Sequence, residues 1–376
     1  MISLSGTTLA AVLLATSFAV AQIAPPKVTF ENGASRLIVQ DKPFLIRGAE
    51  LGNSSAGTAA EADTVLPKMA AMHINTVLMP VAWEQTEPVE GRFDFSILDH
   101  WVEVARQHDL HLVLLWFGSW KNALSEYAPA WVKADTKRFP REIGADGEQT
   151  EILTPLGDET RKCDARAFAA LMHHVKEMDA AKQTVLMVQV ENEIGFLGRG
   201  GRDRSEMANR LFDDYVPAEL KHSLYVTNLW LLLQEAQSHV NNSGRTWRDV
   251  FGDGADEFFM AWYYARFVED VAAAGKKEYA LPMFMNAQLP APFERAGSYP
   301  AGGPHPKTQL AYRAAAPSID FYAPDIYWPN FEEWIERYSQ LDNPVFVPEA
   351  RLAGSAFNAL YLYGQARGFG FSPCLG

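Results

Sequence analysis

Short, nearly continuous apolar runs alternate along the chain with longer segments in which apolar side chains recur at helical spacing. The first pattern is typical of buried parallel strands, and the second of helices that cover a sheet with one face. The strand-like runs are residues 44–49, 76–80, 112–117, 185–190, 282–286, 320–323, 345–347 and 368–371. Helical patterns cover residues 64–72, 96–108, 165–178, 256–274, 331–340 and 356–363. Eight strands with helices between them predict an α/β fold, the (β/α)8 or TIM barrel. Six strands plus a second domain is the alternative.

Two connections between the predicted strands are much longer than the others. Residues 118–160 follow the third strand, and residues 195–254 follow the fourth. Because loops after the strands of a barrel lie on its catalytic face, we expect both segments to shape or cover the site. Only Cys374, Leu375 and Gly376 follow the eighth strand. We therefore expect a catalytic barrel over residues 42–376 that is C-terminally truncated after strand eight.

The first 21 residues have the pattern of a secretory signal peptide. An apolar segment at residues 9–20 leads into an Ala-x-Ala motif and is too short to span a membrane. We expect cleavage before Gln22 and a secreted or periplasmic protein; a misassigned start codon or a buried strand are the alternatives. Residues 22–41 predict a linker followed by a hairpin that turns at Asn32 and Gly33.

Composition excludes several classes of partner. The net charge of −13 argues against nucleic acid, because phosphate binding requires clustered Lys and Arg. Beyond the first 21 residues no apolar run is long enough for a membrane span, so no membrane partner is expected. The two cysteines, Cys163 and Cys374, cannot build a disulfide framework, and the nine histidines show no metal-site spacing. We expect neither a metal nor another cofactor.

Two of the apolar runs lead into glutamates. The fourth run continues into Gln189, Glu191 and Glu193, whose alternation would point all three to one side of a strand. The seventh run passes through a proline to Glu349. An isolated charge at the end of a buried strand is costly unless it is paired or used, so we infer a function for these residues. Two such glutamates are what glycoside hydrolysis requires.

Other polar and aromatic residues follow the predicted strands, where barrel enzymes carry their catalytic groups. These residues are Glu50, Asn53, Trp83, Glu84, Trp116, Trp120, Lys121, Asn122, Asn192, Asn286, Asp325, Tyr327, Trp328 and Arg351. For Trp83 and Trp116 both a core position and a sugar platform are open, and their place at strand ends favours the platform. Trp120, Tyr127 and Trp131, in the insertion after the third strand, are expected to contact the sugar or the aglycone.

Two segments carry a family resemblance. Residues 189–195, QVENEIG, closely resemble the Gln-x-Glu-Asn-Glu-Tyr-Gly signature of glycoside hydrolase family 35, the retaining β-galactosidases. Residues 83–88, WEQTEP, with residues 91–96, GRFDFS, resemble that family's Trp-Asn-x-His-Glu-Pro and Gly-x-Phe-Asp-Phe-Ser block. The similarity extends from about Lys42 to the end of the chain.

The resemblance implies roles for individual residues. Glu193 matches the acid/base and Glu349 the nucleophile. Asn192 is then expected to bind the sugar 2-hydroxyl, and Tyr327 to hydrogen-bond the nucleophile. The expected substrate contacts are Asn192, Tyr327, Glu84, Trp116, Lys121, Asn122, Asn53 and Trp328.

The chain also departs from the better-known members of that family. Glu84 stands where they have Asn, and Thr86 where they have His. Residues 116–122 replace their Gly-Pro-Tyr-x-Cys-Ala-Glu-Trp stretch, which helps to hold galactose. These departures indicate a divergent bacterial branch.

The two glutamates and the resemblance together predict a retaining exo-β-galactosidase that acts on β-galactosides or related oligosaccharides without a cofactor. A retaining mechanism needs one protonated and one ionised carboxyl group about 5–5.5 Å apart. We expect burial and Glu349 to raise the pKa of Glu193, while Tyr327 and Arg351 keep Glu349 ionised. The alternatives are a β-glucosidase, an endo-acting glucanase or mannanase, and a carbohydrate-binding barrel without turnover.

Overall fold

The computed structural model describes residues 23–226 and 243–374 of the chain. The signal peptide expected at residues 1–21 lies outside the described residues, as does the middle of the 195–254 segment. Within the two described ranges, no helix has the length and apolar character needed to span a bilayer.

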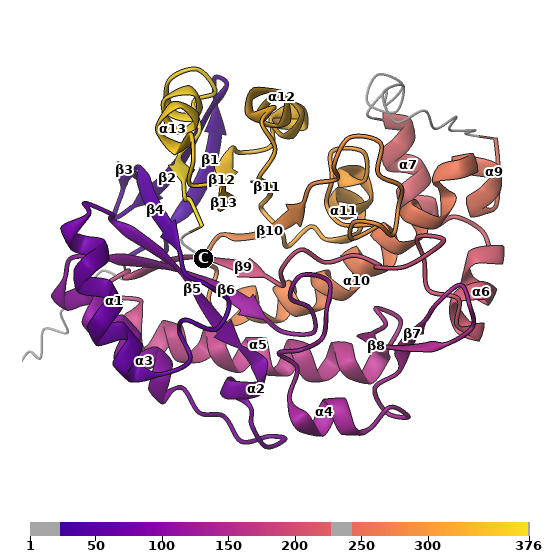
Figure 1. The fold of residues 1–376 in the computed structure, drawn as a ribbon, viewed down its shortest axis with the longest axis horizontal. Helices are drawn as coiled ribbons and strands as arrows, with labels where there is room; N and C mark the ends of the chain where they lie inside the picture. Colours follow the sequence, from indigo (N-terminus) through magenta and orange to yellow (C-terminus); the bar gives the residue numbers. More distant parts are fainter. Residues whose placement is uncertain (1–22, 227–242, 375–376) are drawn as a thin grey trace, which may run out of the picture.

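In the described part of the chain, nine parallel strands form one sheet that nearly closes into a barrel (Figure 1). They are β4 (Ile46–Glu50), β5 (Thr76–Ala82), β6 (His111–Phe117), β9 (Val185–Val190), β10 (Met283–Gln288), β11 (Phe321–Ile326), β12 (Phe346–Val347), β13 (Glu349–Ala350) and β14 (Gly370–Phe371). Their order in the sheet is β12-β14-β4-β5-β6-β9-β10-β11-β13. All eight predicted strand positions are occupied, so the predicted TIM barrel is confirmed.

The two end strands of this order are halves of one strand, separated by Pro348. β12 pairs with β14, with Phe346 opposite Gly370, whereas β13 pairs with β11, with Glu349 opposite Asp325. Proline has no N–H to donate to a ladder, so the strand changes its partner at this residue. The change brings the sheet round on itself and sets Glu349 beside Asp325 at the carboxyl end of the barrel.

Six helices occupy the predicted helical segments: α1 (Ala59–Ala71), α3 (Ser96–Gln107), α5 (Asp158–Asp179), α10 (Ala255–Glu278), α12 (Phe331–Tyr338) and α13 (Ser355–Gly364). α1 begins before the predicted residue 64 because Thr58 and Glu61 form a capping box at its start. Most of α10 is buried, and it packs along α5 on the outside of the barrel (Figure 1). Apolar side chains between these helices and the sheet form the main core.

A three-stranded sheet precedes the barrel. β1 (Lys27–Glu31) and β2 (Ala34–Val39) form an antiparallel hairpin, and β3 (Lys42–Phe44) pairs with β2. Asn32 and Gly33 both have positive φ, as a tight two-residue hairpin turn requires. Leu37 and Val39 pack against side chains inside the barrel, including Phe321, so this sheet covers the end opposite the candidate site.

The two long insertions contain elements that the periodicity did not predict. The insertion after β6 holds α4 (Ala130–Ala134) and the hairpin β7 (Arg141–Ile143) and β8 (Gln149–Leu153). The insertion after β9 holds α6 (Glu206–Asp213), α7 (Ala218–Val226) and α9 (Trp247–Phe251), followed by the short 3-10 turn η1 (Gly252–Gly254). Elsewhere, α2 (Trp83–Thr86), α11 (Gln309–Ala315) and η2 (Gln340–Asp342) were also not predicted.

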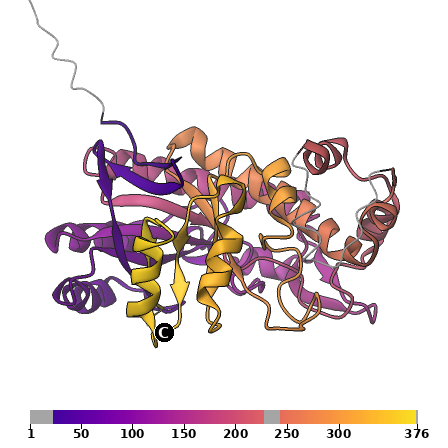
Figure 2. The same cartoon turned by 90° about the horizontal axis from the view of Figure 1, so that it is seen from above.

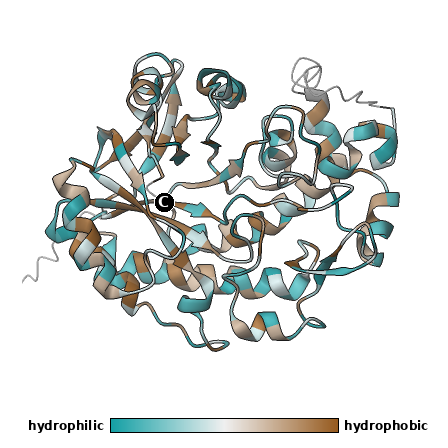
Figure 3. Cartoon of the chain, in the orientation of Figure 1, coloured by the Kyte–Doolittle hydropathy of each residue, from teal (hydrophilic) through white to brown (hydrophobic). Residues whose placement is uncertain are grey.

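The helices of the second insertion (salmon) lie on the right in Figures 1 and 2, the β7–β8 hairpin lies near them in Figure 1, and α4 lies at the bottom of Figure 1. Hydropathy separates the layers: brown residues line the central strands, and teal residues cover much of the outer surface of the helices (Figure 3). The barrel interior is filled by large side chains, with Phe284 stacked on Phe321 and Phe346 stacked on Phe369. Polar groups that could do chemistry therefore collect above this layer, at the carboxyl ends of the strands.

Candidate active site

β9 ends at Val190, and the next residues leave the strand conformation. Glu191 and Glu193 have φ values of 61° and 45°, in the left-handed region. The expectation that Gln189, Glu191 and Glu193 point to the same side is therefore wrong. Glu191 accepts the backbone N–H of Trp120 at 2.8 Å and faces the helix layer, whereas Glu193 faces the end of the barrel.

Glu193 and Glu349 meet at the carboxyl end of the barrel, together with Asp325. One carboxylate oxygen from each of the three lies within 4.8 Å of the others, and all three side chains are buried. They come from the ends of β9, β13 and β11, three different strands. The two glutamates that the sequence singled out are thus brought together.

Glu193 is buried among polar groups that change its pKa. Burial, and secondarily the charge of Glu349, raise the pKa of Glu193 to about 7, while Lys121 opposes the shift. Asn122 Nδ2 donates to Glu193 Oε2, and Asn286 Oδ1 accepts the backbone N–H of Glu193 at 2.9 Å. Near neutral pH a large fraction of Glu193 therefore carries its proton.

Glu349 is surrounded by donors. Tyr327 OH donates to Glu349 Oε2 at 2.9 Å, and Oε1 accepts from Asn192 Nδ2 at 3.3 Å and from Asn286 Nδ2 at 3.2 Å. A carboxylate is the form that accepts from all three. Burial and the charge of Glu349 raise the pKa of Tyr327, so its hydroxyl stays protonated and remains a donor. Arg351, expected as a further donor, is exposed, and the two asparagines take that place.

Two further carboxyl groups belong to this site although the sequence reasoning placed them only at strand ends. Asp325 accepts from Asn286 Nδ2 at 2.8 Å and is hydrogen-bonded to Glu193. Burial and then the charge of Glu349 raise the pKa of Asp325 and of Glu50 well above their usual values. Both groups are therefore held as neutral acids, and at Glu50 the charge of Lys121 opposes the shift.

A tight turn after β6 delivers the polar groups that face Glu193. Lys121 and Leu124 exchange backbone hydrogen bonds around Asn122 and Ala123, which both have positive φ. Lys121 Nζ and the Asn122 backbone N–H donate to Asn192 Oδ1 at 2.9 and 3.3 Å. Asn192 is thereby oriented with its amide nitrogen towards Glu349. Lys121, Asn122 and Asn192, three of the predicted substrate contacts, therefore lie next to one another.

Asn53 and Trp328 lie at the edge of this group. Asn53 Nδ2 approaches Asn122 Oδ1 at 3.4 Å and is exposed. Trp328 follows β11, is 36% exposed, and donates from its indole N–H to the backbone of Leu289 at 3.2 Å. Glu84 lies farther out, in α2, where it pairs with Lys133 at 3.1 Å rather than with the carboxyl groups. The prediction of Glu84 as a sugar contact has no support from this geometry.

The predicted sugar platform is wrong for Trp116, and the predicted contact of Trp120 with the sugar or the aglycone is also wrong, because both side chains are 0% exposed. Trp116 lies between β6 and α5, where its indole N–H donates to Asp164 at 2.9 Å and its ring packs against Phe168. Trp120 donates to the backbone of Leu153 at 3.0 Å and is enclosed by aromatic rings of α10. Alternation in β6 sends Trp116 to the helix layer, and Trp120, which follows the strand, packs in the same layer.

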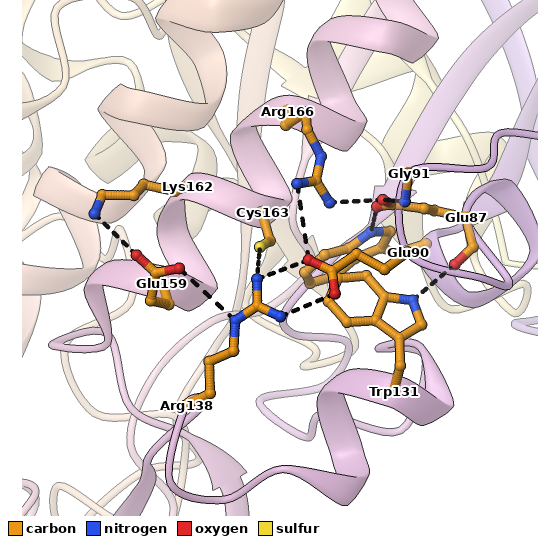
Figure 4. Close-up of polar contacts among 10 residues, drawn as sticks. Glu87, Glu90, Gly91, Trp131, Arg138, Glu159, Lys162, Cys163 and Arg166 are labelled. Carbon is orange, nitrogen blue, oxygen red and sulfur yellow. Dashed lines mark hydrogen bonds and ion pairs between the residues drawn. The ribbon is translucent and has the colours of Figure 1, made fainter.

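Residues of the WEQTEP segment (83–88) form buried hydrogen bonds that stabilise the fold (Figure 4). Glu87 is fully buried and accepts from Trp83 Nε1 at 2.9 Å, from the Gly91 backbone N–H at 2.6 Å and from Arg166 at 2.7 Å. Trp131 Nε1 donates to the Glu87 carbonyl at 3.1 Å. Trp83 and Trp131 are therefore parts of this packing, not of a sugar platform.

The donor set argues against a cation among the three central carboxyl groups. Glu193, Asp325 and Glu349 are close enough to share a metal ion as far as oxygen positions go. However, amide and phenol hydrogens already point at both oxygens of Glu349 and at one oxygen each of Asp325 and Glu193. Groups that donate hydrogen bonds suit hydroxyl-bearing ligands better than a metal ion.

The fold and the comparison with family models define the class of protein: the chain is a TIM-barrel glycoside hydrolase. Residues 55–231 match the model of glycoside hydrolase family 42, described as β-galactosidase. The match is to family 42 and not to family 35, which the motifs resemble. No curated protein matches the chain.

Solved structures share the barrel. The catalytic domain of β-amylase from Paenibacillus polymyxa superposes with a TM-score of 0.58 at 11% identity, covering 87% of this chain and 91% of that one. Exo-β-1,4-mannosidase Op5Man5 from Opitutaceae bacterium strain TAV5 superposes with a TM-score of 0.53 at 15% identity, covering 92% of this chain and 55% of that one. At these identities the likeness shows the fold.

Proposed function

We propose that the chain is a retaining exo-β-galactosidase in which Glu193 is the acid/base and Glu349 the nucleophile. The observation that carries the proposal is the separation of at most 4.8 Å between carboxylate oxygens of the two residues. Retaining glycosidases hold their two carboxyl groups about 5–5.5 Å apart, whereas inverting enzymes need about 6.5–9.5 Å to admit a water molecule between them. The short separation favours retention.

In the first step, Glu349 attacks the anomeric carbon while Glu193 gives its proton to the glycosidic oxygen. The bond between the anomeric carbon and that oxygen breaks, the aglycone leaves as an alcohol, and Glu349 becomes a glycosyl ester. The donors on Glu349 hold the attacking carboxylate in place. The raised pKa of Glu193 makes the proton available near neutral pH.

In the second step, water replaces the ester bond. The ester has no charge, so the carboxyl group of Glu193 loses the neighbouring anion that helped to raise its pKa. Glu193 can then accept a proton from water, whose oxygen attacks the anomeric carbon and frees Glu349. The two inversions give net retention of configuration.

The galactoside specificity rests on the family 42 match and on the strand-four motif. Asn192 is proposed to bind the sugar 2-hydroxyl, since its side chain lies between Lys121 and Glu349. The second candidate is a retaining β-glycosidase that acts on another sugar. Residues 116–122 replace the stretch that helps family 35 enzymes to hold galactose, so they do not specify galactose as the substrate. A set of nitrophenyl β-glycosides tests the sugar, and galactose is expected to be turned over fastest.

Azide separates the two roles. Glu349→Ala should abolish turnover, and azide should restore it with a glycosyl azide of inverted configuration as the product. Glu193→Ala should keep activity on substrates with good leaving groups and should give the retained azide product. Wild-type rates for both variants on an unactivated galactoside would contradict the proposal. They would favour a carbohydrate-binding barrel or a different catalytic pair.

A further inference from the structure

Two buried carboxyl groups behind the candidate site take no part in the proposed reaction. Glu191 is the first acid of the strand-four motif, two residues before Glu193, and Asp164 lies in α5. Both side chains are 0% exposed, and the charge of Asp164 is among the causes that raise the pKa of Glu191. We call these two residues the acid pair.

Both oxygens of the Asp164 carboxyl group accept hydrogen bonds. Oδ1 accepts from the Trp116 indole at 2.9 Å, and Oδ2 accepts from the backbone N–H and the hydroxyl of Ser119 at 2.9 and 2.6 Å. Three donors on one buried carboxyl group suit its ionised form. Asp164 is therefore the acceptor within the acid pair.

Glu191 has the complementary pattern. Its Oε2 accepts the backbone N–H of Trp120 at 2.8 Å, while Oε1 meets no donor among the described residues. An ionised Glu191 would leave that oxygen buried and unsatisfied beside a second anion, which is costly. A protonated Glu191 satisfies every atom, because Oε1 then becomes the donor to Asp164.

Gly118 gives independent evidence that the two groups converge. A Cβ built on Gly118 would lie 2.7 Å from Glu191 Oε1 and 2.8 Å from Asp164 Oδ1. Both oxygens therefore crowd the same point beside the backbone that follows β6. A glycine is what allows the acid pair to close over this backbone.

We propose that Glu191 is protonated and donates to Asp164, and that this acid pair positions the acid/base Glu193. The proposal rests on the proposed function of Glu193. It assigns Glu191 and Asp164 as positioning residues, because neither touches the reacting groups.

The acid pair can position Glu193 because it joins the segments that follow β6 and β9. Asp164 holds Ser119 and Glu191 holds Trp120, so the backbone after β6 is fixed against the backbone after β9. The Asn192 backbone N–H also donates to the Trp120 carbonyl at 3.2 Å. The next residue but one after Trp120 is Asn122, whose amide donates to Glu193.

Among residues 23–226 and 243–374, no Lys, Arg or His forms an ion pair with either acid of the pair. The cations nearest to Asp164 along α5 are Arg161, Lys162 and Arg166, and each pairs with another carboxylate. On the β6 side, Lys121 Nζ donates to Asn192. The groups that face the acid pair from β6 are the indole, hydroxyl and backbone groups already named, all of them neutral.

The pair should therefore respond to alkaline pH. Burial, followed by the charge of Asp164, raises the pKa of Glu191 well above its usual value. A group whose pKa is higher in the folded state contributes stability below its unfolded pKa and loses that contribution as pH rises through the folded pKa. Above that point two buried anions would face each other.

The first experiment measures leaving-group dependence in Glu191→Ala and in its conservative counterpart Glu191→Gln. A glutamine can donate its amide N–H to Asp164 and accept from Trp120, so its kcat on a phenyl glycoside should stay near the wild-type value. Glu191→Ala should lower kcat on the phenyl glycoside by about 100-fold, the scale of a small misplacement, and change KM little. On a dinitrophenyl glycoside, whose leaving group needs no proton, the loss should be much smaller.

The second experiment compares melting temperatures across pH. The Tm of Glu191→Gln minus that of the wild-type protein should increase from about pH 5 to about pH 9, because only the wild-type pair holds a proton that becomes costly to keep. A difference that is flat or falls with pH would mean that Glu191 is ionised in the folded protein and would overturn the proposal.

Glu193→Ala, measured on the same two glycosides, separates the two proposals. If Glu193→Ala shows no leaving-group dependence, the proposed function fails. If Glu193→Ala does show leaving-group dependence but Glu191→Ala slows the hydrolysis of both glycosides equally, the acid pair only supports the fold. The positioning role is then wrong.

Discussion

Asn286 donates to Glu349 through its side-chain nitrogen, with Nδ2 3.2 Å from Oε1. The oxygen of the same amide accepts the backbone N–H of Glu193 at 2.9 Å. A single side chain on β10 thus fixes the relative position of the two proposed catalytic groups. Because β10 lies between β9 and β11 in the sheet, it can reach both ends of the site.

Asn286→Ala should therefore lower kcat. Hydrogen bonds to charged groups contribute about 1.5–3 kcal/mol, so we expect a loss of about 10-fold to 100-fold on an unactivated galactoside. Asn358→Ala, on the outer helix α13, is the matched control and should leave kcat unchanged. Equal rates for both variants would show that Asn286 does not organise the pair.

The pH profile should report Glu193. As a general acid it must be protonated, so kcat/KM should fall as pH rises through its pKa of about 7. Lys121 opposes the shift, so Lys121→Met should raise the pKa further and move the alkaline limb to higher pH. Lys162→Met, on the surface of α5, should not move it. An alkaline limb that stays in place in Lys121→Met would contradict the assignment of this limb to Glu193.

Tyr327→Phe removes the hydroxyl that donates to Glu349 Oε2 at 2.9 Å. We expect kcat to fall by roughly 10-fold to 100-fold, because the nucleophile loses one of its donors while the ring remains. Tyr361→Phe on α13 is the control for loss of a partly exposed hydroxyl. Single-turnover kinetics should assign the defect to formation of the glycosyl ester; a change in KM alone would place Tyr327 in sugar binding.

Much of the fold could be predicted because buried parallel strands carry continuous apolar runs, and all eight runs proved to be strands. The interruption of the seventh strand at Pro348 is also visible as a proline in the sequence. Its consequence, the change of partner between β14 and β11, depends on tertiary pairing and could not be predicted. The short helices of the insertions were missed because their sequences carry too few turns for a clear period.

The site was predicted only in part. Glu193 and Glu349 were found because each follows a buried strand, and the same signal applied to Asp325 and Glu50. The expected alternation of side chains fails after Val190, because Glu191 and Glu193 both have left-handed φ values and their side chains point in different directions. Asp164 carried no local signal at all, since an aspartate on a helix normally faces solvent and here it faces the strands.

Exposure decides which tryptophan can bind a sugar. Trp328 is 36% exposed at the end of β11, so Trp328→Ala should raise KM by an amount equivalent to about 1 kcal/mol of aromatic stacking, with little change in Tm. Trp120→Ala, which empties a fully buried position, should lower stability by about 3–5 kcal/mol and leave KM of the remaining folded enzyme unchanged. Parallel KM values and thermal melts check both; the reverse pattern would restore Trp120 as a sugar contact.

Gly118→Ala tests the space around the acid pair directly. The added Cβ would meet the Trp116 indole nitrogen, Glu191 Oε1 at 2.7 Å and Asp164 Oδ1 at 2.8 Å. All three atoms belong to fully buried side chains with no free space to move into, and overpacking of this kind costs about 1–3 kcal/mol. Gly364→Ala, at the end of α13 where a Cβ meets nothing within 4 Å, is the matched control and should be neutral.

If the strain displaces the backbone after β6, Gly118→Ala should also reproduce the kinetic signature of Glu191→Ala, with a larger loss of kcat on a phenyl glycoside than on a dinitrophenyl glycoside. That result would connect the backbone after β6 to Glu193 by a route that leaves both acids of the pair intact. A Tm and a kcat equal to those of the wild-type protein would show instead that the acid pair can move aside, and that the close approach at Gly118 does not hold the site in place.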